Sequence, residues 1–100
     1  MTVHIETIHF TADSKLKDYI QSKMDKIEKL YNKSNEVNVT LKLENSGQVR
    51  DKITEIKMRV PGQDIFVSAV DKTFEASFDE ALDTLKRQLK KYKEKMVTTR

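Results

Sequence analysis

The residues of this chain that could carry out chemistry are two histidines, many carboxylates and many lysines, and the chain contains no cysteine. His4 and His9 are five residues apart, on a predicted strand and just beyond it, so their imidazoles should point to opposite faces. A zinc ion needs several nitrogen, sulfur or carboxylate ligands brought close together, and this spacing does not supply them. We therefore expect no metal site and no cofactor.

Asp79 and Asp83 are four residues apart on a predicted helix and could in principle form a general acid/base pair. Arg87 lies four residues beyond Asp83, in register for an ion pair, and acids before bases complement the helix dipole. A structural role therefore accounts for both aspartates. The sequence also lacks a glycine-rich phosphate loop, a G-x-S-x-G motif and a serine flanked by a plausible base. We expect no catalysis and no small-molecule substrate.

The strongest chemical signal is the concentration of cationic residues near the end of the chain, on one predicted helix from Asp71 to Lys95. Apolar residues recur there every three or four positions, which is typical of a helix that packs on a core. This apolar stripe consists of Phe74, Phe78, Ala81, Leu82, Leu85, Leu89, Tyr92 and Met96. The remaining positions are acidic in the first half and basic in the second half. The distribution of the charged residues along this helix is therefore more informative about binding partners than the modest net charge of +3.

Helical geometry places these cations relative to the core. With Leu85 at the centre of the buried stripe and about 100° per residue, Lys86, Lys90 and Lys93 fall on one flank. Arg87 and Lys91 point away from the core, and Lys95 lies on the other flank. A first predicted helix adds three lysines along one side, Lys15, Lys26 and Lys33. Lys23 lies near the edge of the apolar stripe of that helix. Two such helices side by side would form a cationic groove or ridge with few acids at that end.

This surface suits contacts with a nucleic-acid backbone, which follow shape and charge rather than base sequence. The same pattern also fits a solubilising helix end whose charges compensate the helix dipole. Base stacking is poorly provided for, because Tyr31 and Tyr92 belong to apolar stripes.

The elements that must position these residues follow from the periodicity of the chain. Val3 and Ile5 alternate with polar residues in an opening strand, and Asp13 is a good N-cap. The first helix has an apolar stripe at Leu16, Tyr19, Ile20, Met24, Ile27, Leu30 and Tyr31, and Asn32 to Asn35 should end it. Three strands follow, with alternating apolar residues at Val37, Val39, Leu41 and Leu43, at Ile56, Met58 and Val60, and at Ile65, Val67 and Ala69. We expect a hairpin loop from Asn45 to Val49 and a tight turn at Pro61-Gly62-Gln63.

The predicted order is therefore β-α-β-β-β-α. A right-handed crossover through the first helix makes the first two strands parallel neighbours, and hairpins join the others antiparallel. We predict an α+β two-layer sandwich, in which both helices cover one face of a four-stranded sheet. We expect residues 1–100 to form a single domain with an ordered core of about residues 2–96 and a short tail at 97–100. Without cysteine, signal-like start or long apolar segment, we expect a cytoplasmic protein that does not enter membranes.

The chain resembles a known family in an ordered set of residues between Val3 and Met96. In the strand before the last helix these are Ser68-Ala69, and in the last helix they are Ala76, Asp79, Asp83, Leu85, Arg87-Gln88-Leu89, Lys91, Lys93 and Lys95. In the first helix they are Leu16, Lys23, Lys26, Glu28 and Lys33, and in the strands Val37-x-Val39-x-Leu41-Lys42-Leu43-Glu44 and Val60-Pro61-Gly62. This set is similar to the ribosome hibernation promoting factors and to the related ribosome-associated inhibitors once called protein Y.

The resemblance implies a domain related to double-stranded RNA-binding domains and a function on the ribosome. It implies binding to the small ribosomal subunit in the channel for mRNA and tRNA, inhibition of translation, and preservation of idle ribosomes, with ribosome pairing aided by a helper protein as a further possibility. The rRNA contacts carried over by the resemblance are Lys23, Lys26, Arg87 and Lys91, followed by Lys33, Lys93 and Lys95. Helix geometry adds Lys86 and Lys90 to this set.

Three positions depart from the family pattern. Thr73 and Glu75 stand where relatives often have an aspartate and an aromatic residue, and Thr84 stands where a lysine is frequent. Two other functions remain open at this point: a free-standing domain that binds duplex RNA away from the ribosome, and a protein-interaction module whose basic helix meets an acidic partner.

Overall fold

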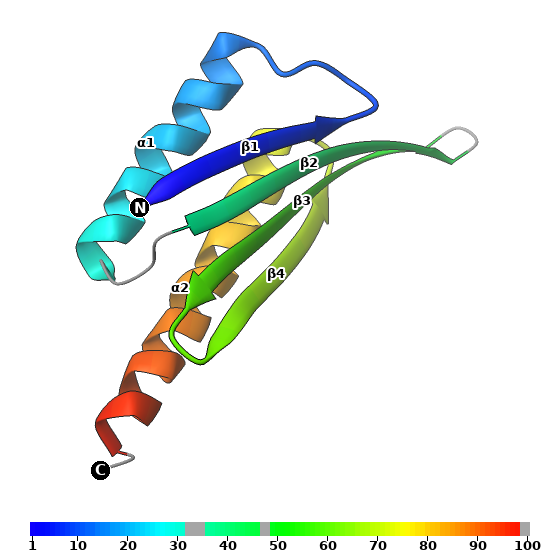
Figure 1. Ribbon diagram of the computed structural model, residues 1–100. Helices are drawn as coiled ribbons and strands as arrows, with labels where there is room; N and C mark the ends of the chain where they lie inside the picture. The colour runs from blue at the N-terminus through cyan, green and yellow to red at the C-terminus, as the bar shows by residue number, and fades with distance from the viewer. Residues whose placement is uncertain (32–35, 47–48, 99–100) are drawn as a thin grey trace.

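The computed structural model describes residues 1–31, 36–46 and 49–98, and it has the predicted order of elements (Figure 1). These elements are β1 (Thr2–Ile8), α1 (Ser14–Leu30), β2 (Glu36–Ser46), β3 (Val49–Val60), β4 (Gln63–Asp71) and α2 (Phe74–Thr98). Within these described residues, no helix is both long enough and apolar enough to cross a membrane.

The four strands form one sheet in the order β1-β2-β3-β4. β1 and β2 are parallel, with Val3 opposite Val37, as a crossover through α1 requires. β2 pairs antiparallel with β3, and β3 pairs antiparallel with β4. The predicted topology is therefore confirmed.

One face of the sheet carries the core, and both helices pack on it. Alternate residues of the strands point toward the helices and are buried, which confirms the predicted apolar sets. On the sheet they are Val37, Val39, Leu41, Ile56, Met58, Val60, Ile65 and Val67, and on the helices Leu16, Ile20, Met24, Ile27, Phe78, Ala81, Leu82, Leu85 and Leu89. Leu43, toward the far end of the long β2-β3 hairpin, is only half-buried. Figure 1 shows α2 passing behind the sheet, so the opposite face stays open.

Among the residues that the structure describes, the core contains one hydrogen bond between buried polar side chains. Thr54 on β3 and Ser77 on α2 are both fully buried, and their hydroxyl oxygens lie 2.7 Å apart in a hydrogen bond. Ser77 Oγ also donates to the carbonyl oxygen of Phe74. The two hydroxyls therefore satisfy each other, and their burial does not leave an unpaired polar group.

The first helix begins as predicted, but Leu30 in its predicted apolar stripe is not buried. Asp13 is the N-cap, because its Oδ1 accepts a hydrogen bond from the amide of Leu16 at 2.9 Å. The helix ends at Leu30, before the predicted Asn32 to Asn35 segment, which lies outside the described residues. Leu30 was expected in the buried stripe, yet 51% of it is exposed. Apart from Leu89, the α2 residues around it are Lys86, Lys90, Lys93 and Glu94, whose charged groups stay in water and leave Leu30 uncovered.

The second helix begins three residues later than predicted and runs further. β4 continues to Asp71, and α2 extends from Phe74 to Thr98. Thr73 supplies the cap: its Oγ1 accepts a hydrogen bond from the amide of Ala76 at 3.1 Å. Threonine therefore does at this position what an aspartate does in a more typical cap.

One of the two hairpin connections is shorter than predicted, and the other has the predicted turn. β2 and β3 pair as far as Ser46 opposite Val49, so the connection is shorter than the predicted Asn45 to Val49 loop. Gly62 has a φ of 88°, which the predicted Pro61-Gly62-Gln63 turn requires and which glycine adopts without strain.

Candidate nucleic-acid interface

A groove separates α1 from α2 on the surface away from the sheet. It has a volume of about 320 Å³, and the cations Lys23, Lys26 and Lys86 line it. Two carboxylates, Asp79 and Asp83, line it as well. The groove of lysines expected between the two helices is therefore present at Lys23, Lys26 and Lys86, and two aspartates share it. The expectation of few acids concerned the basic end of α2, where Glu94 is the one acid between Lys86 and Lys95.

Asp79 makes the groove less cationic than the sequence suggests. Tyr19 donates its hydroxyl proton to this carboxylate, with its oxygen 2.8 Å from Oδ1 and 2.7 Å from Oδ2. Lys23 Nζ lies 3.0 Å from Asp79 Oδ1 and 4.7 Å from the centre of the Tyr19 ring. Hydrogen bonding to Tyr19 and to Asp79 raises the pKa of Lys23 above its usual value. Lys23 is thus charged but already paired, which the sequence did not indicate.

A second hollow of about 360 Å³ lies near the C-terminal ends of both helices. Leu30 and Leu89 form its apolar part, and Lys86, Lys90 and Lys93 line it together with Glu94. The predicted common flank of Lys86, Lys90 and Lys93 is therefore confirmed. Lys93 Nζ donates to the carbonyl oxygen of Leu30 at 3.0 Å, so this lysine also caps the end of α1. Sequence reasoning missed Leu30 as a surface residue of this hollow.

The remaining predicted cations lie on the outer surface of α2. Arg87, Lys91 and Lys95 are exposed, as their helical positions predicted. Arg87 Nη2 donates to Thr84 Oγ1 at 3.2 Å, and the expected ion pair with Asp83 is not formed. Lys33 lies outside the described residues. The cationic ridge, as we call Lys86, Arg87, Lys90, Lys91, Lys93 and Lys95, thus extends over one end of α2.

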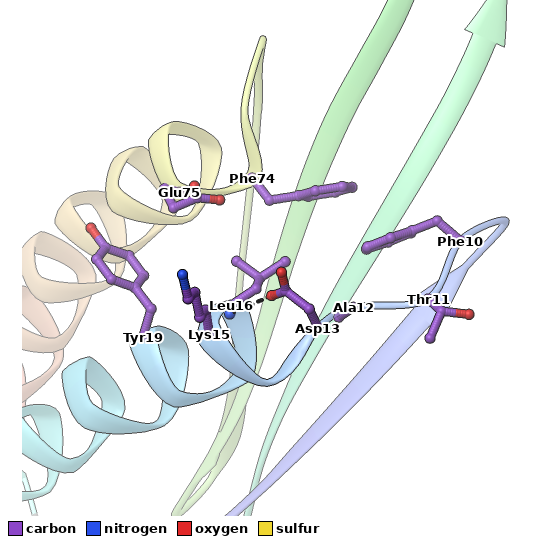
Figure 2. Close-up of a pocket in the computed structure, with 9 residues that line it drawn as sticks. All are labelled: Phe10, Thr11, Ala12, Asp13, Lys15, Leu16, Tyr19, Phe74 and Glu75. Atoms are coloured by element: carbon purple, nitrogen blue, oxygen red, sulfur yellow. Dashed lines mark hydrogen bonds between the residues drawn. The ribbon is translucent and has the colours of Figure 1, made fainter.

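A larger hollow of about 450 Å³ lies at the other end of the helices, where the β1-α1 connection meets the start of α2 (Figure 2). The rings of Phe10 and Phe74 stack there at 4.4 Å between centres and 11° between planes. Asp13, which also lines this hollow, is engaged as the cap of α1. Figure 2 shows Lys15 and Tyr19 of α1 and Glu75 of α2 among the residues that line this hollow. This hollow thus combines the stacked rings of Phe10 and Phe74 with the charged side chains of Asp13, Lys15 and Glu75.

Comparison with known proteins agrees with this architecture. The family described as Sigma 54 modulation protein / S30EA ribosomal protein matches residues 3–97. The ribosome hibernation promoting factor of Pseudomonas putida is 33% identical over 95 residues, which cover 95% of this chain and 89% of the relative. The factor of the same name from Escherichia coli K12 is 32% identical over 81 residues, which cover 81% of each chain.

Two solved structures share the fold. A ribosomal subunit interface protein from Coxiella burnetii has a TM-score of 0.84 at 18% identity, covering 94% of this chain and 99% of that chain. The N-terminal domain of Thermus thermophilus Protein Y has a TM-score of 0.77 at 22% identity, covering 92% and 99%. The family match spans nearly the whole chain, and the similarity to curated relatives is equally extensive. The chain belongs to the Sigma 54 modulation protein / S30EA ribosomal protein family.

Proposed function

We propose that this protein is a ribosome hibernation factor that binds the small ribosomal subunit, occupies the channel for mRNA and tRNA, and thereby inhibits translation and preserves idle ribosomes. Relatives that are 32 to 33% identical carry the name ribosome hibernation promoting factor, and the structural neighbours include a ribosomal subunit interface protein. The protein would therefore act in the cytoplasm, without cofactor, metal ion or small-molecule substrate.

The observation that carries this proposal is the cationic ridge. Between Lys86 and Lys95 the helix has six cations and one acid, Glu94, and the side chains of all six cations are exposed. Cations on successive turns of one helix can approach several backbone phosphates at once, and each contact releases counterions. Such contacts position a protein on folded RNA without reading its bases. Lys26, across the groove on α1, extends the same surface.

The ridge is held rigidly by the core beneath it. Leu85, Leu89 and Tyr92 on the opposite side of α2 are buried, and the hydroxyl of Tyr92 donates to the carbonyl oxygen of Pro61 at 2.7 Å. Binding therefore needs no ordering of the helix backbone, and the loss of entropy is confined to lysine and arginine side chains.

The proposed mechanism is occlusion, not catalysis. A protein that fills the channel should inhibit translation in proportion to the ribosomes present, and excess message and tRNA should relieve the inhibition. In vitro translation titrated with the protein tests this directly. Strong inhibition at doses far below the ribosome concentration would indicate an enzyme that acts on the ribosome and would refute occlusion.

The role of the ridge is tested by replacing Arg87 and Lys91 together with glutamine. Both side chains are exposed, so folding should be unchanged while binding to purified small subunits weakens. The slope of log affinity against log salt should flatten by about one to two units, because about two phosphate contacts are lost. The matched control replaces Lys17 and Lys72, which are exposed at the other end of the helices, with glutamine. Equal effects of the two double variants would show that only overall charge matters and that the ridge is not the binding site.

A sedimentation experiment separates ribosome binding from a free-standing RNA-binding role. In lysate of stationary-phase cells, the protein should migrate with small subunits or with whole ribosomes. Recovery only at the top of the gradient, together with affinity for duplex RNA, would favour a domain that acts away from the ribosome.

A further inference from the structure

The open face of the sheet, opposite the helices, carries its own pattern of side chains. Alternation along the strands places Phe66, Ser68 and Val70 of β4 on this face, because their neighbours Ile65 and Val67 are buried in the core. Phe66 is 59% exposed and Val70 is 52% exposed. These are the largest exposures of apolar side chains on the sheet within the described residues.

Strand register continues this apolar pattern across the sheet. Ile8 lies opposite Lys42, Lys42 opposite Ile53, and Ile53 opposite Val70, so these residues form one row over all four strands. Ile8 and Ile53 are partly exposed. No described segment of the chain covers this row or Phe66, and Figure 1 shows this side of the sheet turned away from α2. The open face thus presents apolar groups that the fold itself does not use.

The charge of the open face is opposite to that of the cationic ridge. Among the described side chains, the register places six carboxylates on it, at Glu6, Glu36, Glu44, Asp51, Glu55 and Asp64. Only three lysine or arginine residues share this face, and each has a nitrogen close to one of its carboxylates. Lys42 lies 3.2 Å from Glu55, and Lys57 and Arg59 lie 3.7 Å and 3.6 Å from Asp64.

This combination fits a protein better than it fits RNA. A surface with an excess of carboxylates repels phosphates, and its cations are already engaged within the sheet. A cationic protein segment is attracted by the same field, and an apolar side chain on that segment can bury Phe66 or Val70. An exposed aromatic residue beside polar groups is also the type of residue that anchors protein interfaces.

We propose that the open face is a second docking surface, which binds a cationic protein segment of the small ribosomal subunit while the ridge on α2 contacts rRNA. This inference rests on the proposed function, since it places both contacts on one particle. The two faces divide the binding by chemistry: phosphates on the helix side, and a basic, partly apolar protein surface on the sheet side.

Site-specific photo-crosslinking on purified small subunits tests whether the open face contacts protein while the ridge contacts rRNA. Phe66→p-benzoylphenylalanine should yield a crosslinked species whose size on a denaturing gel is unchanged by ribonuclease, which identifies a protein partner. Lys90→p-benzoylphenylalanine, on the ridge, should yield a crosslink to rRNA. A crosslink from position Lys90 to rRNA without any crosslink from position Phe66 would overturn the open-face proposal alone. A crosslink from position Phe66 to rRNA would do the same. The absence of any crosslink at both positions would overturn the proposed function as well.

Binding measurements with a matched pair of variants give a second readout. Phe66→Ser should weaken binding to intact small subunits about fivefold or more, the size of effect expected for an interface anchor, and leave binding to protein-free rRNA unchanged. Leu30→Ser removes a similarly exposed apolar residue from the helix side and should not show this difference between intact subunits and bare rRNA. Equal affinity of Phe66→Ser and the parent for intact subunits would refute the proposal, as would equal weakening on both targets.

Discussion

The Asp79→Asn substitution tests whether a carboxylate inside the groove restrains the cations around it. Asp79 holds the Lys23 ammonium at 3.0 Å, and a neutral amide at this position would leave that charge available to a phosphate. One more phosphate contact should steepen the slope of log affinity against log salt by up to about 0.7 to 0.9 units. At low salt the variant should bind RNA of the small subunit about two- to fivefold more tightly than the parent.

The same substitution should cost little stability. The side chains of Lys23 and Asp79 are 34% and 44% exposed, so solvent screens their attraction, and an exposed pair contributes about 0.2 to 1 kcal/mol. Tyr19 can still donate to the carbonyl oxygen of asparagine, although a bond to a neutral acceptor is weaker than one to a carboxylate. We expect a total loss of about 1 kcal/mol in the free energy of unfolding, measured by urea denaturation.

The control for this prediction is Asp83→Asn, which makes the same change of charge in the same groove. Asp83 makes no ion pair with any side chain that the structure describes, so its removal frees no cation. A salt titration of binding should therefore show a steeper slope for Asp79→Asn than for Asp83→Asn. Identical slopes for both variants and the parent would show that Lys23 does not reach RNA even when it is released.

Three further predictions concern the fold. Leu85 is fully buried, so Leu85→Ala should lower the free energy of unfolding by about 2 to 5 kcal/mol in urea titrations, and a loss well below 1 kcal/mol would contradict its place in the core. Gly62→Ala should cost about 1 to 2 kcal/mol by the same measurement, because a residue with a Cβ is strained at a φ of 88° although its surroundings are open; a neutral result would show that the turn relaxes. Burial raises the pKa of Tyr31 to about 12, whereas the pKa of a tyrosine in the unfolded chain is near 10. The contribution of protonated Tyr31 to the stability of the folded state is therefore complete below pH 10 and is lost as the pH rises toward 12. Comparison of unfolding at pH 9 and pH 11.5 should show about 2 kcal/mol more loss for the parent than for Tyr31→Phe, and equal losses would refute the assignment.

The fold could be predicted because its apolar residues follow simple periods. Alternation at Val37, Val39 and Leu41, and three- to four-residue spacing up to Leu89, both depend only on the geometry of a single strand or helix. The flank shared by Lys86, Lys90 and Lys93 could be derived for the same reason.

The hydrogen bonds and the ion pair at Asp79 could not be predicted, because they depend on how two helices far apart in sequence lie against each other. Tyr19 and Lys23 meet Asp79 across 56 or more positions of sequence, and no periodicity within one helix fixes that contact. The exposure of Leu30 has the same origin, since it depends on which α2 residues lie beside it. Phe66 differs: its alternation with Ile65 and Val67 already placed it on the outer face of a predicted strand, so the signal was present in the sequence.

The buried hydroxyl pair of Thr54 and Ser77 has a consequence for the direction in which α2 displays its charges. An apolar stripe alone would tolerate some rotation of the helix about its axis, because one aliphatic side chain can replace another in a packed layer. A hydrogen bond of 2.7 Å between a strand and a helix tolerates almost none, because a shift of one residue turns the helix by about 100° and leaves the buried hydroxyl of Thr54 without Ser77 as its partner. The hydroxyl of Ser77 on the inner side of α2, paired with Thr54 of β3, thus fixes the rotation of the helix about its axis, and this sets the direction in which Arg87 and Lys91 point on the outer side.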